Sequence, residues 1–217
     1  IMNKKILSAL LSALLLLSFS LSFSACKKEP AKQSDVEKYS YLTFETDEES
    51  ECATVVGYNR KTIPDELAIP SKIDGYLVSA IGEYAFSDCK TVVSVTIPDS
   101  VETIGRSAFS GCFALENITL PKKMEVIPTE IFANCRSLKK VNIPDNAITI
   151  EMWAFYSCEK LVHVKLPEKL VSIEQEAFVN CTNLSICLPK NVQLQGRIAT
   201  RGLYNLFPIS NTCGIIV

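Results

Sequence analysis

The side chains of this chain that could ligate a metal ion or act as a strong nucleophile are nine cysteines and a single histidine. Structural zinc sites use Cys and His ligands, with cysteine pairs spaced by about two to four residues. No CxxC pair occurs here, and His163 is the one imidazole available. A Cys–His nucleophile would also have to recruit His163, and no GxSxG, phosphate-loop or HExxH motif is present. We therefore expect no catalytic activity, no metal site and no cofactor.

Five of the cysteines recur every 23 residues, and each follows a phenylalanine by three residues. The pairs are Phe86–Cys89, Phe109–Cys112, Phe132–Cys135, Phe155–Cys158 and Phe178–Cys181. A strict period of this length indicates a solenoid, in which each repeat buries its apolar face by stacking on its neighbours. The five cysteines should then form one column of small buried hydrophobes, with parallel Cβ directions that disfavour disulfides. Cys52, Cys187 and Cys213 lie outside the column, and a bond between two of them remains open.

The repeat pattern predicts the elements that position these side chains. An apolar-variable-apolar triplet, such as Val95 to Ile97, is typical of a short alternating strand. Stacked at the repeat period, such strands must run parallel. Each triplet ends at a proline, which cannot donate to the next strand; these are Pro98, Pro121, Pro144, Pro167 and Pro189. A second apolar pair, such as Val101 and Ile104, then turns the chain toward the Phe, where Ala-Phe favours a short helical turn on an outer arc.

Two glycines occupy one periodic position after this second apolar pair. Gly82 and Gly105 stand where other repeats have Pro128, Glu151 and Glu174. A position that accepts proline cannot need a positive φ. We therefore expect these glycines to be permitted rather than required.

Several elements together make the repeat resemble the BspA-type, or treponemal, leucine-rich repeats. They are the Ile/Leu-Pro strand ending, the Ile-Gly and Ala-Phe elements, and the Cys-x-x-Leu continuation from Cys112 to Leu115. The resemblance covers residues 76–189. It implies a right-handed α/β solenoid with short parallel strands and short helical turns, about five 23-residue repeats long. Residues 39–75 would form an N-terminal cap and lead-in repeat, and residues 190–217 a C-terminal cap.

The N-terminal region predicts export. Lys4 and Lys5 precede an apolar run that ends in small residues, which is typical of a signal peptide, here residues 1–25. An uncleaved membrane helix is the competing interpretation. Residues 21–26, Leu-Ser-Phe-Ser-Ala-Cys, resemble a bacterial lipobox with Cys26 as the lipid-modified residue, although Phe23 replaces the usual Leu. Ordinary secretion is the alternative. Residues 26–38 lack apolar periodicity and predict a flexible tether.

The variable strand positions are the candidate contact residues, because they should share one solvent-facing surface, usually the concave one. They are Ser94, Thr96, Asn117, Thr119, Lys140, Asn142, His163 and Lys165. They change from hydroxyl and amide to cationic side chains, which suits an acidic protein or a glycan; a merely solvated face is the alternative. Trp153 is also a candidate contact residue. We expect it to be partly exposed, and either to anchor a partner or to cover a neighbouring repeat. With 22 basic and 24 acidic residues and no basic stripe, we expect no nucleic-acid partner.

These features predict a non-catalytic cell-surface lipoprotein whose solenoid binds protein or glycan partners. The family resemblance adds adhesion to host or neighbouring cells, including matrix proteins. The alternative hypothesis is an envelope-internal scaffold or assembly protein that binds another bacterial protein.

Overall fold

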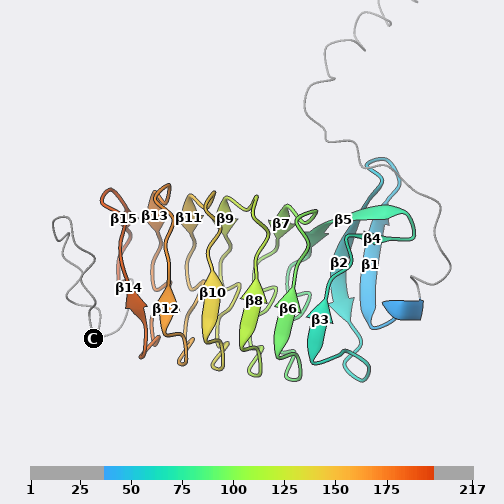
Figure 1. Cartoon of the computed structure of the whole chain (residues 1–217), viewed down its shortest axis with the longest axis horizontal. Helices are drawn as coiled ribbons and strands as arrows, with labels where there is room; N and C mark the ends of the chain where they lie inside the picture. The colour runs from blue at the N-terminus through green and yellow to red at the C-terminus, as the bar shows by residue number, and fades with distance from the viewer. Residues whose placement is uncertain (1–36, 198–217) are drawn as a thin grey trace, which may run out of the picture.

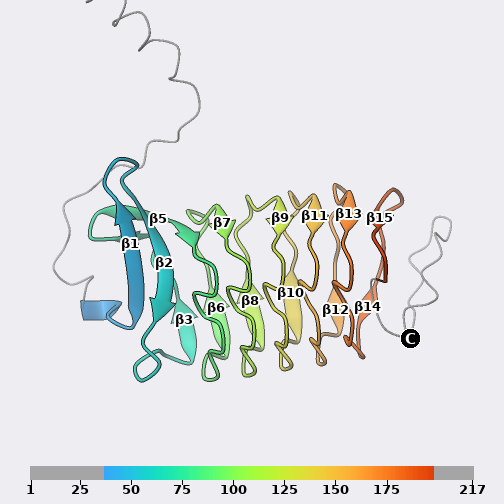
Figure 2. The same cartoon turned by 180° about the vertical axis from the view of Figure 1, so that it is seen from behind.

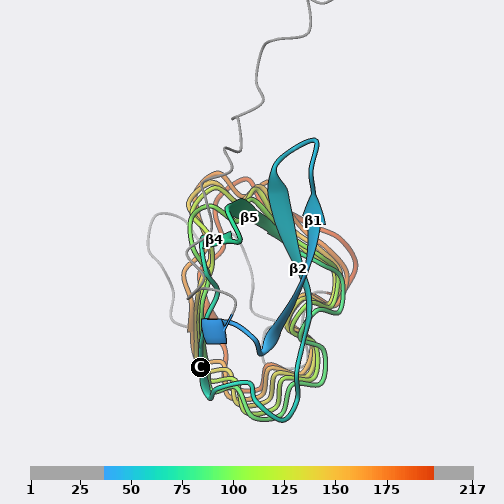
Figure 3. The ribbon, with the colours of Figure 1, turned by 90° about the vertical axis from the view of Figure 1, so that its right-hand side faces the viewer.

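A computed structural model describes residues 37–197 of the chain. In these residues the repeats form a solenoid, with successive coils side by side along one axis (Figure 1; Figure 2, from behind). Viewed along that axis, the coils superpose around one shared interior (Figure 3). The solenoid predicted from the 23-residue period is confirmed. The expected leader (1–25), Cys26, and most of the tether (26–38) and C-terminal cap (190–217) lie outside the described residues.

The triplets before the prolines form a parallel sheet of six short strands, called here the six-stranded sheet. Its strands are β3 (Glu66–Ala68), β6 (Ser94–Thr96), β8 (Asn117–Thr119), β10 (Lys140–Asn142), β12 (His163–Val164) and β14 (Ser185–Ile186). Equivalent residues stand opposite one another, as Val95, Ile118 and Val141 do in β6, β8 and β10. Each proline accepts a turn-closing hydrogen bond three residues later, for example from Val101 N–H to the Pro98 carbonyl at 3.1 Å. The strands and their ends are as expected.

Two further sheets were not expected from the sequence. β9 (Val126–Ile127), β11 (Thr149–Ile150), β13 (Ser172–Ile173) and β15 (Gln193–Leu194) form a four-stranded parallel sheet. At the N-terminal end, β1 (Leu42–Asp47), β2 (Cys52–Tyr58), β4 (Lys72–Ile73), β5 (Tyr76–Ile81) and β7 (Thr103–Ile104) form a five-stranded sheet. The antiparallel β1–β2 hairpin covers the first coil and adds Leu42, Ala53 and Val55 to the core. The strands β7, β9, β11, β13 and β15 have two residues each, which is too short for an alternating pattern to be recognised in the sequence.

Pro128 separates these two sheets. In other repeats the residue after the second apolar pair donates its N–H to the previous coil: Gly105 to the Ile81 carbonyl at 2.8 Å, and Glu151 to the Ile127 carbonyl at 2.9 Å. Proline has no N–H to donate. Accordingly β7 and β9, though equivalent in sequence, are not paired in the described sheets.

The outer arc, defined as residues 82–89 and their equivalents at 105–112, 128–135, 151–158 and 174–181, carries a third ladder between coils. Phe86 N–H donates to the Ala108 carbonyl at 2.8 Å, and Phe109 N–H to the Ile131 carbonyl at 3.0 Å. The expected helical turns occur here as isolated turns closed by bonds three residues apart, such as Cys89 N–H to the Phe86 carbonyl.

Residues with positive φ explain why the arc does not continue as a helix. They fill two periodic columns: Tyr84, Ser107, Glu130, Trp153 and Glu176 in the first, and Asp88, Gly111, Asn134, Ser157 and Asn180 in the second. A left-handed residue ends a right-handed turn, and it is costly for side chains other than glycine. In the second column four of the five residues are Asp, Gly or Asn, types that adopt positive φ most readily, whereas the first column carries no such signal.

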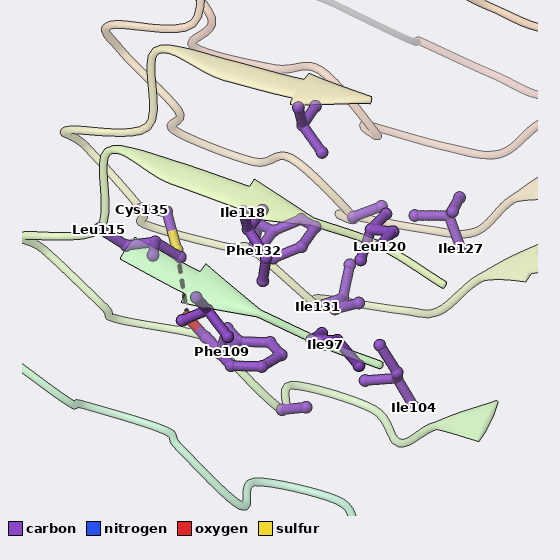
Figure 4. Packing of buried hydrophobic residues seen from close by; sticks show 14 of the residues in the cluster. Ile97, Ile104, Phe109, Leu115, Ile118, Leu120, Ile127, Ile131, Phe132 and Cys135 are labelled. Atoms are coloured by element: carbon purple, nitrogen blue, oxygen red, sulfur yellow. Dashed lines mark hydrogen bonds between the residues drawn. The ribbon is translucent and has the colours of Figure 1, made fainter. Parts of the chain in front are cut away.

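The five phenylalanines stack along the solenoid axis in its interior, and Figure 4 shows two neighbours of the stack, Phe109 and Phe132. Each has at most 1% of its surface exposed. Neighbouring ring centroids lie 5.1–5.9 Å apart, and Tyr58 extends the stack from the N-terminal hairpin at 5.8 Å from Phe86. Burial and the nearby Cys89 raise the pKa of Tyr58 to about 12. The predicted Phe column is confirmed.

The five periodic cysteines are buried and free, as expected. Each thiol from the second repeat onward donates to the Phe carbonyl of the previous coil, as Cys135 Sγ does to Phe109 O at 3.1 Å (Figure 4). Hydrogen bonding with Cys135 and burial raise the pKa of Cys112. Cys52 and Cys187 are disulfide-bonded. Cys52 is the first residue of β2, and Cys187 comes directly after β14.

The expectation that Gly82 and Gly105 are both dispensable is wrong for Gly105. Neither has a positive φ, as argued from Pro128. A Cβ on Gly105, however, would touch the Glu83 backbone nitrogen and lie 2.7 Å from the Gly82 carbonyl carbon. A negative φ does not make the glycine dispensable, because Gly105 of one coil packs directly against the Gly82–Glu83 backbone of the previous coil.

Candidate binding surface

The outer face of the six-stranded sheet brings the predicted contact residues together. One column runs through Glu66, Ser94, Asn117, Lys140, His163 and Ser185, in direct register from strand to strand. A second runs through Ala68, Thr96, Thr119 and Asn142, with Lys165 at the equivalent position after β12. Between them lies the inward column that includes Val95, Ile118 and Val141, all at most 5% exposed. The alternation predicted from the triplets is therefore present in space.

The charge on this face changes along the solenoid axis. The exposed Lys140 and Lys165 lie in the C-terminal half with the exposed His163, whereas the exposed Glu66 lies at the N-terminal edge. Glu66 and Ser185 were missing from the predicted set. The lead-in repeat resembles the others only weakly, and the last repeat lacks one residue before its proline. An alignment of the strand triplets that allows gaps would have placed Glu66 and Ser185 in this column.

The geometry gives no support to a Cys–His nucleophile. His163 is on the solvent-facing column, while the five periodic thiols are buried in the core. Within residues 37–197, no group of three or more Cys, His, Asp or Glu side chains could hold a metal ion. Across that same range, no helix has the length and apolar character needed to cross a membrane.

Trp153 lies on the outer arc and not on the six-stranded face. It is partly exposed, as expected, in the first positive-φ column. Its indole Nε1–H donates to Glu176 Oε2 of the next repeat at 3.0 Å. The side chain therefore links two neighbouring repeats, and the predicted contact set divides between two surfaces.

Two carboxylates beside Trp153 are held in their ionised form. The Ser107 hydroxyl and the Arg106 guanidinium lower the pKa of Glu130; Ser107 Oγ donates to it at 2.6 Å. The Trp153 indole and then Arg197 lower the pKa of Glu176. Each carboxylate accepts hydrogen bonds from side chains of neighbouring coils. Charged hydrogen bonds therefore connect the coils along the outer arc, in addition to the backbone ladder.

The repeat architecture and the sequence identify the family. The model of the BspA type leucine rich repeat region matches residues 67–200 in six copies, so the chain belongs to this family. The six copies agree in number with the six strands of the six-stranded sheet. About five repeats were predicted from the sequence, one fewer. No curated protein matches the chain.

Several solved structures are similar. A leucine rich cell surface protein from Faecalibacterium prausnitzii is 29% identical with a TM-score of 0.61, over 79% of this chain and 42% of that one. The leucine rich repeat protein of T. pallidum is 26% identical with a TM-score of 0.59, over 77% of this chain and 86% of that one. A leucine-rich repeat protein from Eubacterium ventriosum is 27% identical with a TM-score of 0.58, over 71% and 48%. The chain thus spans less than half the length of two of these relatives.

Proposed function

We propose that this chain is an exported, non-catalytic protein that binds a protein partner through the outer face of its six-stranded sheet. The observation that carries the proposal is the register of that face. Backbone ladders hold two columns of exposed and half-buried side chains at fixed spacing across six strands, and all those named above except Ala68 are polar. A rigid surface loses little conformational entropy on binding, which favours its use as a recognition surface.

A protein partner is favoured over a glycan because of the extent of this face and the chemistry of its side chains. Hydroxyl, amide and cationic side chains are spread over the whole sheet, and this breadth suits the roughly ten direct hydrogen bonds of a typical protein interface. Lys140, His163 and Lys165 would lie against an acidic region of the partner. A glycan ligand for the same face is the competing outcome.

For location, we propose a lipid-anchored protein at the cell surface with a role in adhesion. The support is that the similar Faecalibacterium protein is a cell surface protein, together with the lipobox-like sequence that ends at Cys26. Lipidation predicts that Cys26→Ala abolishes incorporation of labelled palmitate. A disulfide-linked peptide containing Cys26 would contradict it, because the lipid thioether uses the same sulfur.

Binding and location can be tested separately. The full chain is screened for saturable binding to purified extracellular-matrix proteins and to a glycan array, and intact cells are treated with protease. Binding to a matrix protein together with cleavage on intact cells supports the surface role. Full protection on intact cells, with cleavage after lysis, would instead support the envelope-internal scaffold.

A further inference from the structure

A surface hollow of about 380 Å³ opens on the outer arc, away from the six-stranded face. Its lining includes two aromatic side chains, two carboxylates and a carboxamide; these belong to Trp153, Tyr156, Glu130, Glu176 and Asn134. The volume falls within the range of about 300–1,000 Å³ that is usual for small-molecule sites. The hollow therefore has the size and the mixed lining of a binding site.

A change of side-chain size along the arc accounts for the hollow. The position occupied by Tyr156 carries Ser110 and Ala133 in the two preceding repeats, and both line the hollow. Two small side chains thus precede a large one in the same column, and Trp153 adds a second large ring from the same turn. The step between Ala133 and Tyr156 leaves an aromatic surface facing open space.

Two polar groups in the hollow have no partner within the described residues. The Tyr156 hydroxyl makes no hydrogen bond there, and neither does the Asn134 side-chain amide. By contrast, Asn180, which is equivalent to Asn134, donates to Ser157 Oγ at 3.1 Å. The free amide and phenol can donate and accept simultaneously, which suits a ligand rich in hydroxyl groups.

The charge balance selects against an ionic ligand. Glu130 is paired with Arg106 at 3.1 Å, and Glu176 with Arg197 at 3.2 Å. A cation entering the hollow would compete with these two arginines, and an anion would meet the carboxylates. The carboxylate oxygens keep unused acceptor capacity toward neutral hydroxyl donors.

We propose that this hollow binds one ring of a neutral glycan. The apolar C–H face of the sugar packs against the Trp153 and Tyr156 rings, which offer rigid apolar surface with a polar edge. The Asn134 amide, the Tyr156 hydroxyl and the Glu130 carboxylate hold the sugar hydroxyls. This site is separate from the six-stranded face and does not depend on the protein partner proposed for that face.

The chain contains one tryptophan, so its emission reports on the hollow directly. The full chain is titrated with maltotriose, cellotriose, chitotriose and N-acetyllactosamine, and in parallel with choline, a lysine peptide and sialyllactose. The proposal expects a saturable change in Trp153 emission with at least one neutral oligosaccharide and none with the charged probes. A response confined to choline, the lysine peptide or sialyllactose would overturn it, as would no response to any neutral sugar.

Matched variants then locate the binding. Trp153→Ser removes the aromatic surface, and Ser107 shows that serine fits this positive-φ column. We expect it to weaken sugar binding about tenfold or more, measured by calorimetry. Tyr84→Ser makes the same change in the same column outside the hollow, and should leave affinity within about twofold. Asn134→Asp introduces the residue type that Asp88 already places in the second column, and it should also weaken binding severalfold. Equal affinity of Trp153→Ser and Tyr84→Ser would contradict the site.

Discussion

Two glycines at equivalent positions offer a matched test of how closely the coils pack. In Gly105→Ala the new methyl would overlap the Glu83 backbone nitrogen and lie 2.7 Å from the Gly82 carbonyl carbon and 2.8 Å from Glu83 Cα. All three contacts are backbone atoms, which cannot rotate away. Overpacking of this kind costs about 1–3 kcal/mol of unfolding free energy.

Gly82→Ala is the control, because its methyl would meet Val55 O at 3.4 Å and two side-chain carbons at 3.6 and 3.7 Å. These are ordinary contacts, and alanine restricts the unfolded chain, so stability should be unchanged or raised by up to about 1 kcal/mol. Equilibrium urea unfolding followed by circular dichroism should separate the two variants by about 2 kcal/mol. Equal stabilities, or a Gly105→Ala variant as stable as the parent, would refute the close approach of these coils.

Three further predictions concern the core, the thiols and the arc. Phe132→Ala should lower the unfolding free energy by about 3–5 kcal/mol by leaving a cavity, whereas Phe113→Ala should cost clearly less, because Phe113 is 38% exposed and its removal leaves no closed cavity; similar losses in urea unfolding would place Phe132 outside the core. Burial raises the pKa of the Cys158 thiol, so the five free cysteines should resist iodoacetamide in the native protein and react once it is unfolded; rapid native labelling by mass spectrometry would contradict this. The pKa of Glu176 is lowered by the Trp153 indole and Arg197, so its stabilising bond is complete above the ordinary Glu pKa and is lost as the pH falls through the lower native value. Trp153 emission should therefore change with a midpoint below about 4.3, and Glu176→Gln should abolish that change; a midpoint at or above the ordinary value would argue against the bond.

The parts of the fold that depend on side-chain periodicity could be predicted from the sequence. The six-stranded sheet, the Phe stack and the buried cysteine column all follow from apolar residues that recur at one spacing. The exposed columns on the six-stranded sheet follow from the same alternation. Residues such as Asn117 and Lys140 could therefore be placed in one face before their register was known.

The parts that depend on backbone geometry could not be predicted. The ladder on the outer arc requires positive φ at Trp153 and Glu130, which are side chains that give no hint of it. The break between β7 and β9 follows from one missing N–H, at Pro128, which the sequence shows only once the pairing is known. The hollow beside Tyr156 also depends on which columns neighbour each other on the arc, and this is a property of the stacked coils.

The most direct test of the proposed function compares two charge-matched variants of the full chain. Lys140→Ala with Lys165→Ala alters the six-stranded face, whereas Lys122→Ala with Lys169→Ala removes two exposed cations outside it. Affinity is measured for a matrix protein that binds the parent chain. The account predicts at least about a tenfold loss for the first pair and less than about a twofold loss for the second. Equal losses, or none for the first pair, would contradict binding through this face.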